Sequence, residues 1–166
     1  MANVALKLFA GGPALLFRSH FRVAGDSMTP RLRDGDLLHV IPQALSDSPF
    51  PRSAVVVARS SASDGVFWVK RVIGLPGEFV AVDDCGGILV DDVPLCEPYL
   101  ADSPSHPSPP SAWLCGDDEY FLMGDNRADS SDSRRYGPVH RSAIIGRVWL
   151  HWPSRPGWAF RPRRIR

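Results

Sequence analysis

Short apolar runs separated by turn residues are the dominant pattern along this chain. The runs contain many β-branched and aromatic side chains, which favour extended strands over helices. They predict strands over residues 21–25, 36–41, 54–59, 66–73, 78–82, 87–90, 119–124 and 144–152. Because long amphipathic helical patterns are scarce, we expect a mainly β fold with little helix, built as a coiled, barrel-like antiparallel sheet.

Composition agrees with this expectation. The 166 residues suffice for one domain with a real core, and 14 glycines and 16 prolines favour a loop-rich β protein. The formal net charge of +1 gives no sign that nucleic acid is a main partner. A Pro/Ser-rich stretch from Pro98 to Pro110 predicts an exposed loop, not a domain linker, because strand signals resume after it.

The two ends differ from the middle of the chain. Residues 1–20 contain the apolar segment NVALKLFAGGPALLF, which Lys7 and Pro13 interrupt and which is shorter than the roughly 20 residues that span a bilayer. We expect a weak or degenerate N-terminal anchor or lead-in there. Residues 21–153 form the predicted main domain, and residues 154–166 form a basic C-terminal tail.

Ser27 is the first candidate for chemistry. The segment GDSMTPRL follows a predicted strand and places Ser27 directly after Gly25-Asp26. A serine at a strand end can present its hydroxyl beside backbone N–H groups. Most serines in such positions are only turn residues, so this segment is weak evidence on its own.

Lys70 is the second candidate, because it stands inside the apolar run FWVKRVI. Strand alternation places it on one face with Trp68 and Val72, while Phe67, Val69 and Arg71 point the other way. Burial on that face would disfavour the ammonium form and lower the pKa of Lys70, as a general base requires. The plain alternative is an edge-strand lysine that extends its amine to solvent.

A third segment, GDNRADSSDSRRYG, is dense in side chains that form fixed polar networks. Its aspartates and arginines could lock a loop beside an active site. Taken alone, the segment is equally consistent with a polar surface loop.

Together, GDSMTPRL, VKRVIGLPGE and GDNRADSSDSRRYGPV resemble the three signature segments of the signal peptidase I family, in the family's order, and IIGRVW continues the match. The resemblance covers about residues 21–153. It implies the coiled β fold that this family shares with the proteases of SOS-type repressors.

The resemblance also implies roles for individual residues. Ser27 would be the nucleophile and Lys70 the general base, with Ser130 orienting the lysine and the pair Asp132–Arg134 bracing the site. The resemblance places Met28 at the substrate pocket, and we expect Leu32 and Val69 to line it too. Gly25 stands where some members have a second serine, so backbone donors, chiefly the Ser27 N–H, would hold the oxyanion.

The implied activity is that of a serine endopeptidase which cleaves signal peptides from exported preproteins through an acyl-enzyme. It needs no metal and no cofactor. Its partners would be signal peptides and a membrane surface, without nucleic acid. Its catalytic domain would lie on the extracytoplasmic face of a membrane.

Two alternatives stay open. The chain could be a dedicated maturation protease of the same family, which trims a metalloenzyme precursor or a pilin, because the predicted anchor is weak. It could also be an inactive peptide-binding module on the same fold. A self-cleaving repressor fits poorly, because no helix-turn-helix region precedes residue 21.

Three cysteines are present without the spacing of a metal site. Cys85 and Cys96 flank a hairpin-like stretch and could form a disulfide outside the cytoplasm. Free thiols are the other possibility, and Cys115 would remain unpaired in either case.

Overall fold

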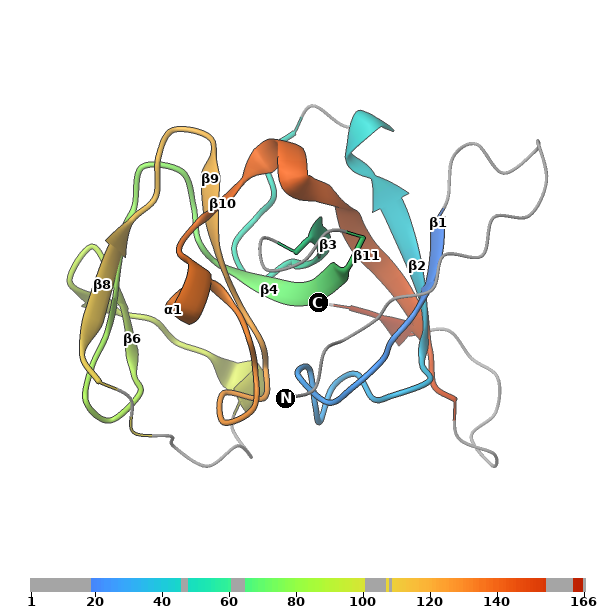
Figure 1. The fold of residues 1–166 in the computed structure, drawn as a ribbon, viewed down its shortest axis with the longest axis horizontal. Helices are drawn as coiled ribbons and strands as arrows, with labels where there is room; N and C mark the ends of the chain where they lie inside the picture. Colours follow the sequence, from blue (N-terminus) through green and yellow to red (C-terminus); the bar gives the residue numbers. More distant parts are fainter. Residues whose placement is uncertain are drawn as a thin grey trace.

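The computed structural model describes residues 19–45, 48–60, 65–100, 107, 109–154 and 163–165. These residues form two antiparallel sheets with very little helix (Figure 1). The larger sheet runs in the order β1-β2-β11-β3-β4-β9-β10, and β12 pairs with β11; the smaller runs β7-β6-β5-β8. The prediction of a mainly β, coiled antiparallel fold is confirmed.

The elements have the following bounds. The larger sheet contains β1 (Ser19–Arg22), β2 (Leu37–Pro42), β3 (Val55–Arg59), β4 (Phe67–Gly74), β9 (Glu119–Met123), β10 (Val139–His140), β11 (Ile144–Trp152) and β12 (Arg163–Arg164). The smaller sheet contains β5 (Phe79–Val82), β6 (Ile88–Val90), β7 (Val93–Pro94) and β8 (Ser111–Leu114). The helical turns are η1 (Gln43–Leu45), η2 (Pro98–Leu100), α1 (Ser133–Tyr136) and η3 (Arg141–Ala143).

Every predicted strand overlaps an observed one, and β11 matches its predicted bounds. Four short strands, β7, β8, β10 and β12, were not predicted. They have two to four residues each, too few for a periodic signal, and each is defined by its pairing with a neighbouring strand. The start of the stretch predicted as an exposed loop also differs, because η2 is a 3-10 turn in which Tyr99 and Leu100 are half-buried.

Both faces of β4 are covered by core residues. Trp68 and Val72 belong to one apolar cluster, and Val69, with Phe67 packed against it, belongs to another. This confirms the predicted alternation along the strand. Lys70 pairs across the ladder with Val56, which belongs to the cluster of Trp68 and Val72. The lysine therefore projects from a strand whose two sides are both buried.

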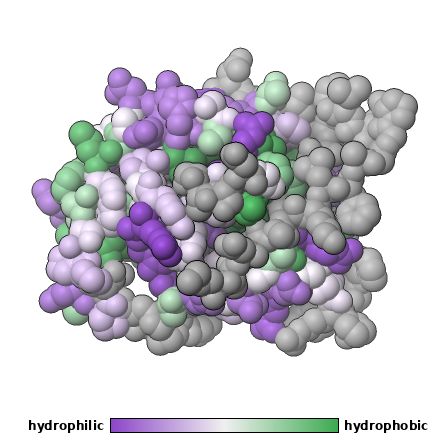
Figure 2. Space-filling model, viewed as in Figure 1, coloured by the Kyte–Doolittle hydropathy of each residue, from purple (hydrophilic) through white to green (hydrophobic). Residues whose placement is uncertain are grey.

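The smaller sheet has an apolar outer edge. Phe79 of β5 and Leu114 of β8 are cross-strand partners, and both side chains are exposed. Figure 2 shows hydrophobic surface at the side of the molecule where Figure 1 places β6 and β8. The inner side of this sheet, including Val80 and Val82, packs into a third core cluster with Phe121.

Several predictions concern residues at the ends. Residues 1–18 of the predicted anchor, and residues 155–162 and 166 of the predicted tail, lie outside the described residues, whereas Arg163–Arg164 form β12. Among the described residues, no helix has the length and apolarity needed to cross a bilayer.

All three cysteines are free thiols: Cys85 and Cys96 are exposed and Cys115 is buried.

Candidate active site

Ser27 lies in a tight turn that follows β1. Gly25, just before it, has a φ of 83°, and its N–H donates to Asp34 Oδ1 at 2.9 Å. After the serine, the N–H and hydroxyl of Thr29 donate to the carbonyl of Asp26 at 3.0 and 2.9 Å. A side chain at position 25 would be strained in this left-handed conformation, so the turn favours glycine there. The backbone around Ser27 is therefore fixed from both sides.

Lys70 reaches Ser27 from the middle of β4, although the two residues are 43 positions apart in the sequence. The Nζ of Lys70 donates to Ser27 Oγ at 2.8 Å and to the carbonyl of Val69 at 3.1 Å. Lys70 is 1% exposed and Ser27 is 9% exposed. The structure thus brings together the two residues that the sequence predicted as nucleophile and base.

The environment of the amine favours its neutral form. Burial lowers the pKa of Lys70 from 10.5 to about 8, although the charges of Asp132 and Asp125 act to raise it. Arg134 adds to the lowering. A lysine with this pKa is half neutral at about pH 8, so a sizeable fraction of it can accept a proton near neutral pH, unlike an ordinary surface lysine.

Asp132 organises the third segment. Its carboxylate accepts the N–H of Gly124 at 3.0 Å and forms an ion pair with the Arg134 guanidinium through two bonds of 2.9 Å. It also caps the one-turn helix α1 by accepting the N–H of Arg134. Burial would raise the pKa of Asp132, but the hydrogen bonds and charge of Arg134, with the Gly124 N–H, lower it. The predicted Asp132–Arg134 pair is present.

Ser130 lies against the turn that holds Ser27. A methyl group built on Gly124 would come within 2.2 Å of Ser130 Oγ and 2.5 Å of the Ser27 carbonyl oxygen, so these three residues are in close contact. Among the described residues, the buried Ser130 Oγ has no hydrogen-bond partner at a suitable distance and angle. Its hydroxyl is nevertheless near enough to the Asp132 carboxylate to contribute to the lowered pKa of Asp132. Its predicted role of orienting Lys70 stays a prediction.

The loop after β9 is hydrogen-bonded directly to the turn that holds Ser27. The backbone N–H of Asn126 donates to the Ser27 carbonyl at 3.0 Å, and its side-chain amide donates to the Asp26 carbonyl at 3.2 Å. The first and third sequence segments therefore form one hydrogen-bonded unit beside Lys70.

A second ion pair beside the dyad was missed by sequence reasoning. Arg71 and Asp125 are both buried, and the guanidinium binds the carboxylate through two bonds of 2.8 and 2.6 Å. Arg71 also donates to the Ser53 carbonyl at 2.7 Å. The available signal was an arginine in an apolar strand, since a buried arginine requires a partner. Its partner is distant in the sequence and could not be chosen from the pattern.

Comparison with known proteins identifies the family of the chain. The sequence model of the family described as signal peptidase, peptidase S26, matches residues 2–152. The chain is 33% identical to signal peptidase I of Bacillus licheniformis, over 80% of this chain and 75% of that protein. It is 31% identical to probable signal peptidase I-1 of Synechocystis, over 94% of this chain and 84% of the relative.

The chain belongs to the signal peptidase family. It is therefore a serine peptidase. Among solved structures, signal peptidase I of Enterococcus faecalis matches with a TM-score of 0.54 and 29% identity, over 61% of this chain and 98% of that one. The fold and the family assignment made from the three segments are both confirmed.

The predicted substrate-pocket residues of this family member occupy the core. Met28, Leu32 and Val69 are all buried in the same apolar cluster. Met28 follows Ser27 in the sequence, and Val69 precedes Lys70. Leu32 lies one turn beyond Met28, and its N–H donates to the Met28 carbonyl at 2.9 Å. Their contact with substrate stays a prediction.

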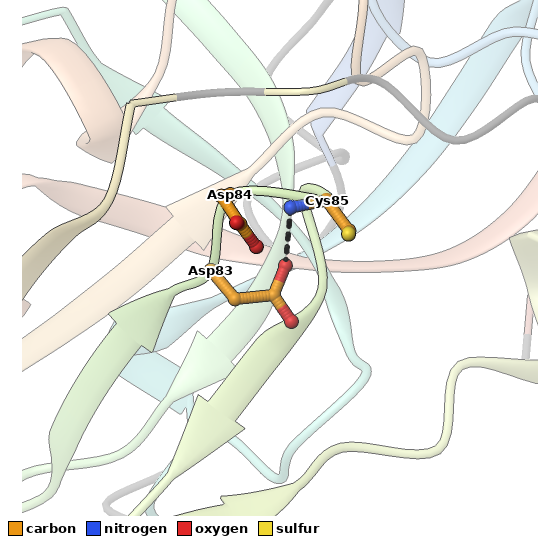
Figure 3. A group of neighbouring side chains, drawn as sticks. All are labelled: Asp83, Asp84 and Cys85. Atoms are coloured by element: carbon orange, nitrogen blue, oxygen red, sulfur yellow. Dashed lines mark hydrogen bonds between the residues drawn. The ribbon is translucent and has the colours of Figure 1, made fainter.

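One cluster of potential metal ligands occurs among the described residues, at the turn Asp83-Asp84-Cys85 (Figure 3). Asp83 Oδ1 already accepts the N–H groups of Cys85 and Gly87, at 2.9 and 2.7 Å. The neighbouring Asp84 carboxylate raises the pKa of the Cys85 thiol, which disfavours the thiolate that metals bind. The turn joins β5 to β6 in the smaller sheet.

Removing the carboxylate of Asp125 tests the buried ion pair. In Asp125→Ala the Arg71 guanidinium stays buried without its counter-charge, so we expect the free energy of unfolding to fall by about 3–5 kcal/mol. Denaturant titration measures this. The matched control is Glu78→Ala, which removes the partner of the more exposed Arg52. A loss at position 125 no larger than that of the control would contradict the assignment.

The lowered pKa of Asp132 predicts a pH dependence of stability. A carboxyl group whose folded pKa lies below its unfolded value stabilises the fold above the unfolded pKa, and this contribution disappears as pH falls through the folded value. We expect Asp132→Asn to unfold with a shallower loss of stability below about pH 4 than the unsubstituted chain. The exposed Asp129 offers a control, Asp129→Asn, which should keep the original slope.

Proposed function

We propose that this protein is a signal-peptide endopeptidase in which Ser27 is the nucleophile and Lys70 the general base. The observation that carries the proposal is the 2.8 Å hydrogen bond from Lys70 Nζ to Ser27 Oγ, made by a buried amine of lowered pKa. Membership of the family, whose relatives bear the name signal peptidase, supports the substrate class.

The steps follow from this pair. Neutral Lys70 takes the hydroxyl proton of Ser27 as the serine oxygen attacks the carbonyl carbon of the scissile bond. The tetrahedral intermediate collapses, the C–N bond breaks, and the leaving amine receives the proton from Lys70. Water then attacks the acyl-enzyme ester, gives its proton to Lys70 and releases the new carboxyl end, and Ser27 regains its proton.

The developing oxyanion needs donors close to Ser27. In this mechanism the backbone N–H of Ser27 is the main donor, held by the rigid turn described above. A serine at position 25 would be strained at the observed φ of 83°. The glycine at this position has no side chain to donate, so the oxyanion site in this mechanism is built from backbone groups.

An extended substrate fits the strand arrangement. Among the described residues, β1 ends the larger sheet and pairs only with β2. The first half of β4, Phe67 to Lys70, pairs with β3, whereas β9 pairs only from Arg71 onward. A peptide added along these open edges would gain backbone hydrogen bonds and bring its scissile carbonyl beside the hydrogen-bonded Ser27–Lys70 pair.

The substrate and setting follow from the family. We expect small side chains at the cleavage site, of the Ala-x-Ala type, with Met28, Leu32 and Val69 behind the pocket wall. Preprotein signal peptides are the expected partners, at a membrane surface and without nucleic acid. Family membership supports a membrane-associated enzyme with its catalytic domain on the extracytoplasmic face.

Substituting either dyad residue should abolish cleavage. In Ser27→Ala the attacking oxygen is absent, and in Lys70→Met an apolar chain of similar length replaces the base. We expect loss of all measurable cleavage of a signal-peptide substrate in detergent, with circular dichroism and thermal unfolding close to those of the unsubstituted chain. The control is Ser131→Ala, an exposed serine of the third segment, which should remain active. Cleavage by either dyad variant would contradict the assignment.

The pKa of Lys70 predicts how the rate depends on pH. Only the neutral amine accepts the serine proton, so kcat/KM should rise about tenfold per pH unit below about pH 8 and level off above it. Initial rates from about pH 6 to about pH 10 measure the profile. A rate that does not change over this range, with the chemical step rate-limiting, would exclude Lys70 as the base.

A further inference from the structure

The segment Glu97 to Leu100 returns from the smaller sheet to the loop that holds the active site. Glu97 binds the Arg127 guanidinium through both carboxylate oxygens, one of them at 2.9 Å from Nη1. The hydroxyl of Tyr99 donates to Glu97 Oε1 at 2.5 Å. The two charged side chains are only 11% and 8% exposed. These contacts form a nearly dry, charge-assisted cluster.

The same segment covers the Arg71–Asp125 pair. The guanidinium carbon of Arg71 lies 4.0 Å from the centroid of the Tyr99 ring, which is a cation–π contact. Tyr99 therefore touches β4 at the residue that follows Lys70. Through Glu97 it is also bonded to Arg127 on the other side.

Arg127 connects this cluster to the nucleophile. Its Nε donates to the Gly124 carbonyl at 3.1 Å. Gly124 has no spare space, because a methyl group there would overlap both Ser130 Oγ and the Ser27 carbonyl oxygen. A shift of Gly124 thus displaces the serines on either side of it.

We propose that Glu97 and Tyr99 are positioning residues for the peptidase reaction, and that together they hold residues 124–127 against β4 so that Lys70 stays buried beside Ser27. We call this pair the Glu97–Tyr99 clamp. The inference rests on the proposed function, since it assigns the clamp a part in the reaction of the dyad. Neither residue touches the reacting atoms.

Release of the clamp should raise the pKa of Lys70. Burial is the main cause of the lowered pKa of Lys70. When the clamp is released, residues 124–127 loosen and water reaches the amine, so its pKa moves back toward the ordinary value. Each pKa unit of this change lowers the neutral fraction, and with it the rate below the midpoint, by about tenfold.

Tyr99 itself does not interfere with the measurement. Burial, with the adjacent Glu97 charge, raises the pKa of Tyr99, so its hydroxyl stays protonated throughout the assay range. Burial would lower the pKa of Arg127, but Glu97 outweighs burial and raises it, so Arg127 stays charged as well.

The first experiment compares pH–rate profiles of the full chain and the variants Glu97→Gln, Tyr99→Leu and Tyr99→Phe. For Glu97→Gln and Tyr99→Leu we expect the rising limb of kcat to move to higher pH. The rate at pH 7 should fall about tenfold for each pKa unit and recover near pH 10, with KM little changed. Tyr99→Phe keeps the ring above Arg71 and should shift less than Tyr99→Leu.

The matched control is Glu78→Gln. Glu78 also pairs with an arginine, Arg52, and also accepts a backbone N–H, from Leu75, and neither of these partners belongs to residues 124–127. It should leave the midpoint of the profile in place. If Glu97→Gln and Tyr99→Leu only lower the melting temperature and keep the midpoint and the kcat per folded molecule, the clamp is a structural contact alone and the proposal is wrong.

A second measurement does not depend on activity. The chain has two lysines, Lys7 and Lys70, so an NMR titration with lysine labelled at Cε resolves the Lys70 amine, assigned by its loss in Lys70→Met. A higher pKa of Lys70 in Glu97→Gln and Tyr99→Leu supports the clamp even where cleavage is not observed; an unchanged pKa overturns it. If the unsubstituted chain is inactive although its Lys70 pKa is low, the proposed function is wrong. The titration of the two variants then still tests whether the clamp keeps the Lys70 pKa low.

Discussion

Burial of the Lys70 amine is the constraint on which the rest of the site depends. A lysine becomes a base only when desolvation outweighs the carboxylates that would keep it protonated. Asp125 and Asp132 both lie close enough to raise the pKa of Lys70. Each of them is held by an arginine, Arg71 and Arg134 respectively. The acidic groups that shape the loop are thereby prevented from forming a direct ion pair with the amine.

The fold meets this requirement by joining segments that are distant in the sequence. β4 supplies the lysine, the turn after β1 supplies the serine, and the loop after β9 covers both. Backbone bonds from the loop to the Ser27 carbonyl, and the tight contact at Gly124, fix their spacing. The smaller sheet reaches this assembly through the segment that follows β7, so both sheets contribute to the environment of one amine.

The sequence predicted those parts that local pattern determines. Long apolar runs gave the principal strands, because strand periodicity and turn residues act over a few positions. The proposal that Ser27 and Lys70 form a dyad came from the resemblance of three segments to a family. Pattern alone left Ser27 as a turn serine and Lys70 as a surface lysine. The contact between them needs the sheet order, which no local pattern specifies.

The missed features share a physical cause. The Arg71–Asp125 pair links residues 54 positions apart, and the Glu97–Arg127 pair links residues 30 apart. Partner choice over such distances is set by tertiary packing. Glu97 directly precedes the Pro/Ser-rich stretch from Pro98 to Pro110, and Tyr99 lies within it, although the composition of that stretch indicates an exposed loop. Composition therefore did not predict that the first residues of that stretch pack over the buried guanidinium of Arg71.

The assembly of the site from three segments also affects when the folding chain can begin to act as a protease in the cell that makes it. In a partly folded chain the amine of Lys70 is hydrated and protonated at neutral pH, so Ser27 has no base and is an ordinary alcohol. In the proposed mechanism, proteolytic power appears only when the last segment closes over the lysine. In that mechanism, completion of the fold is itself the activation step.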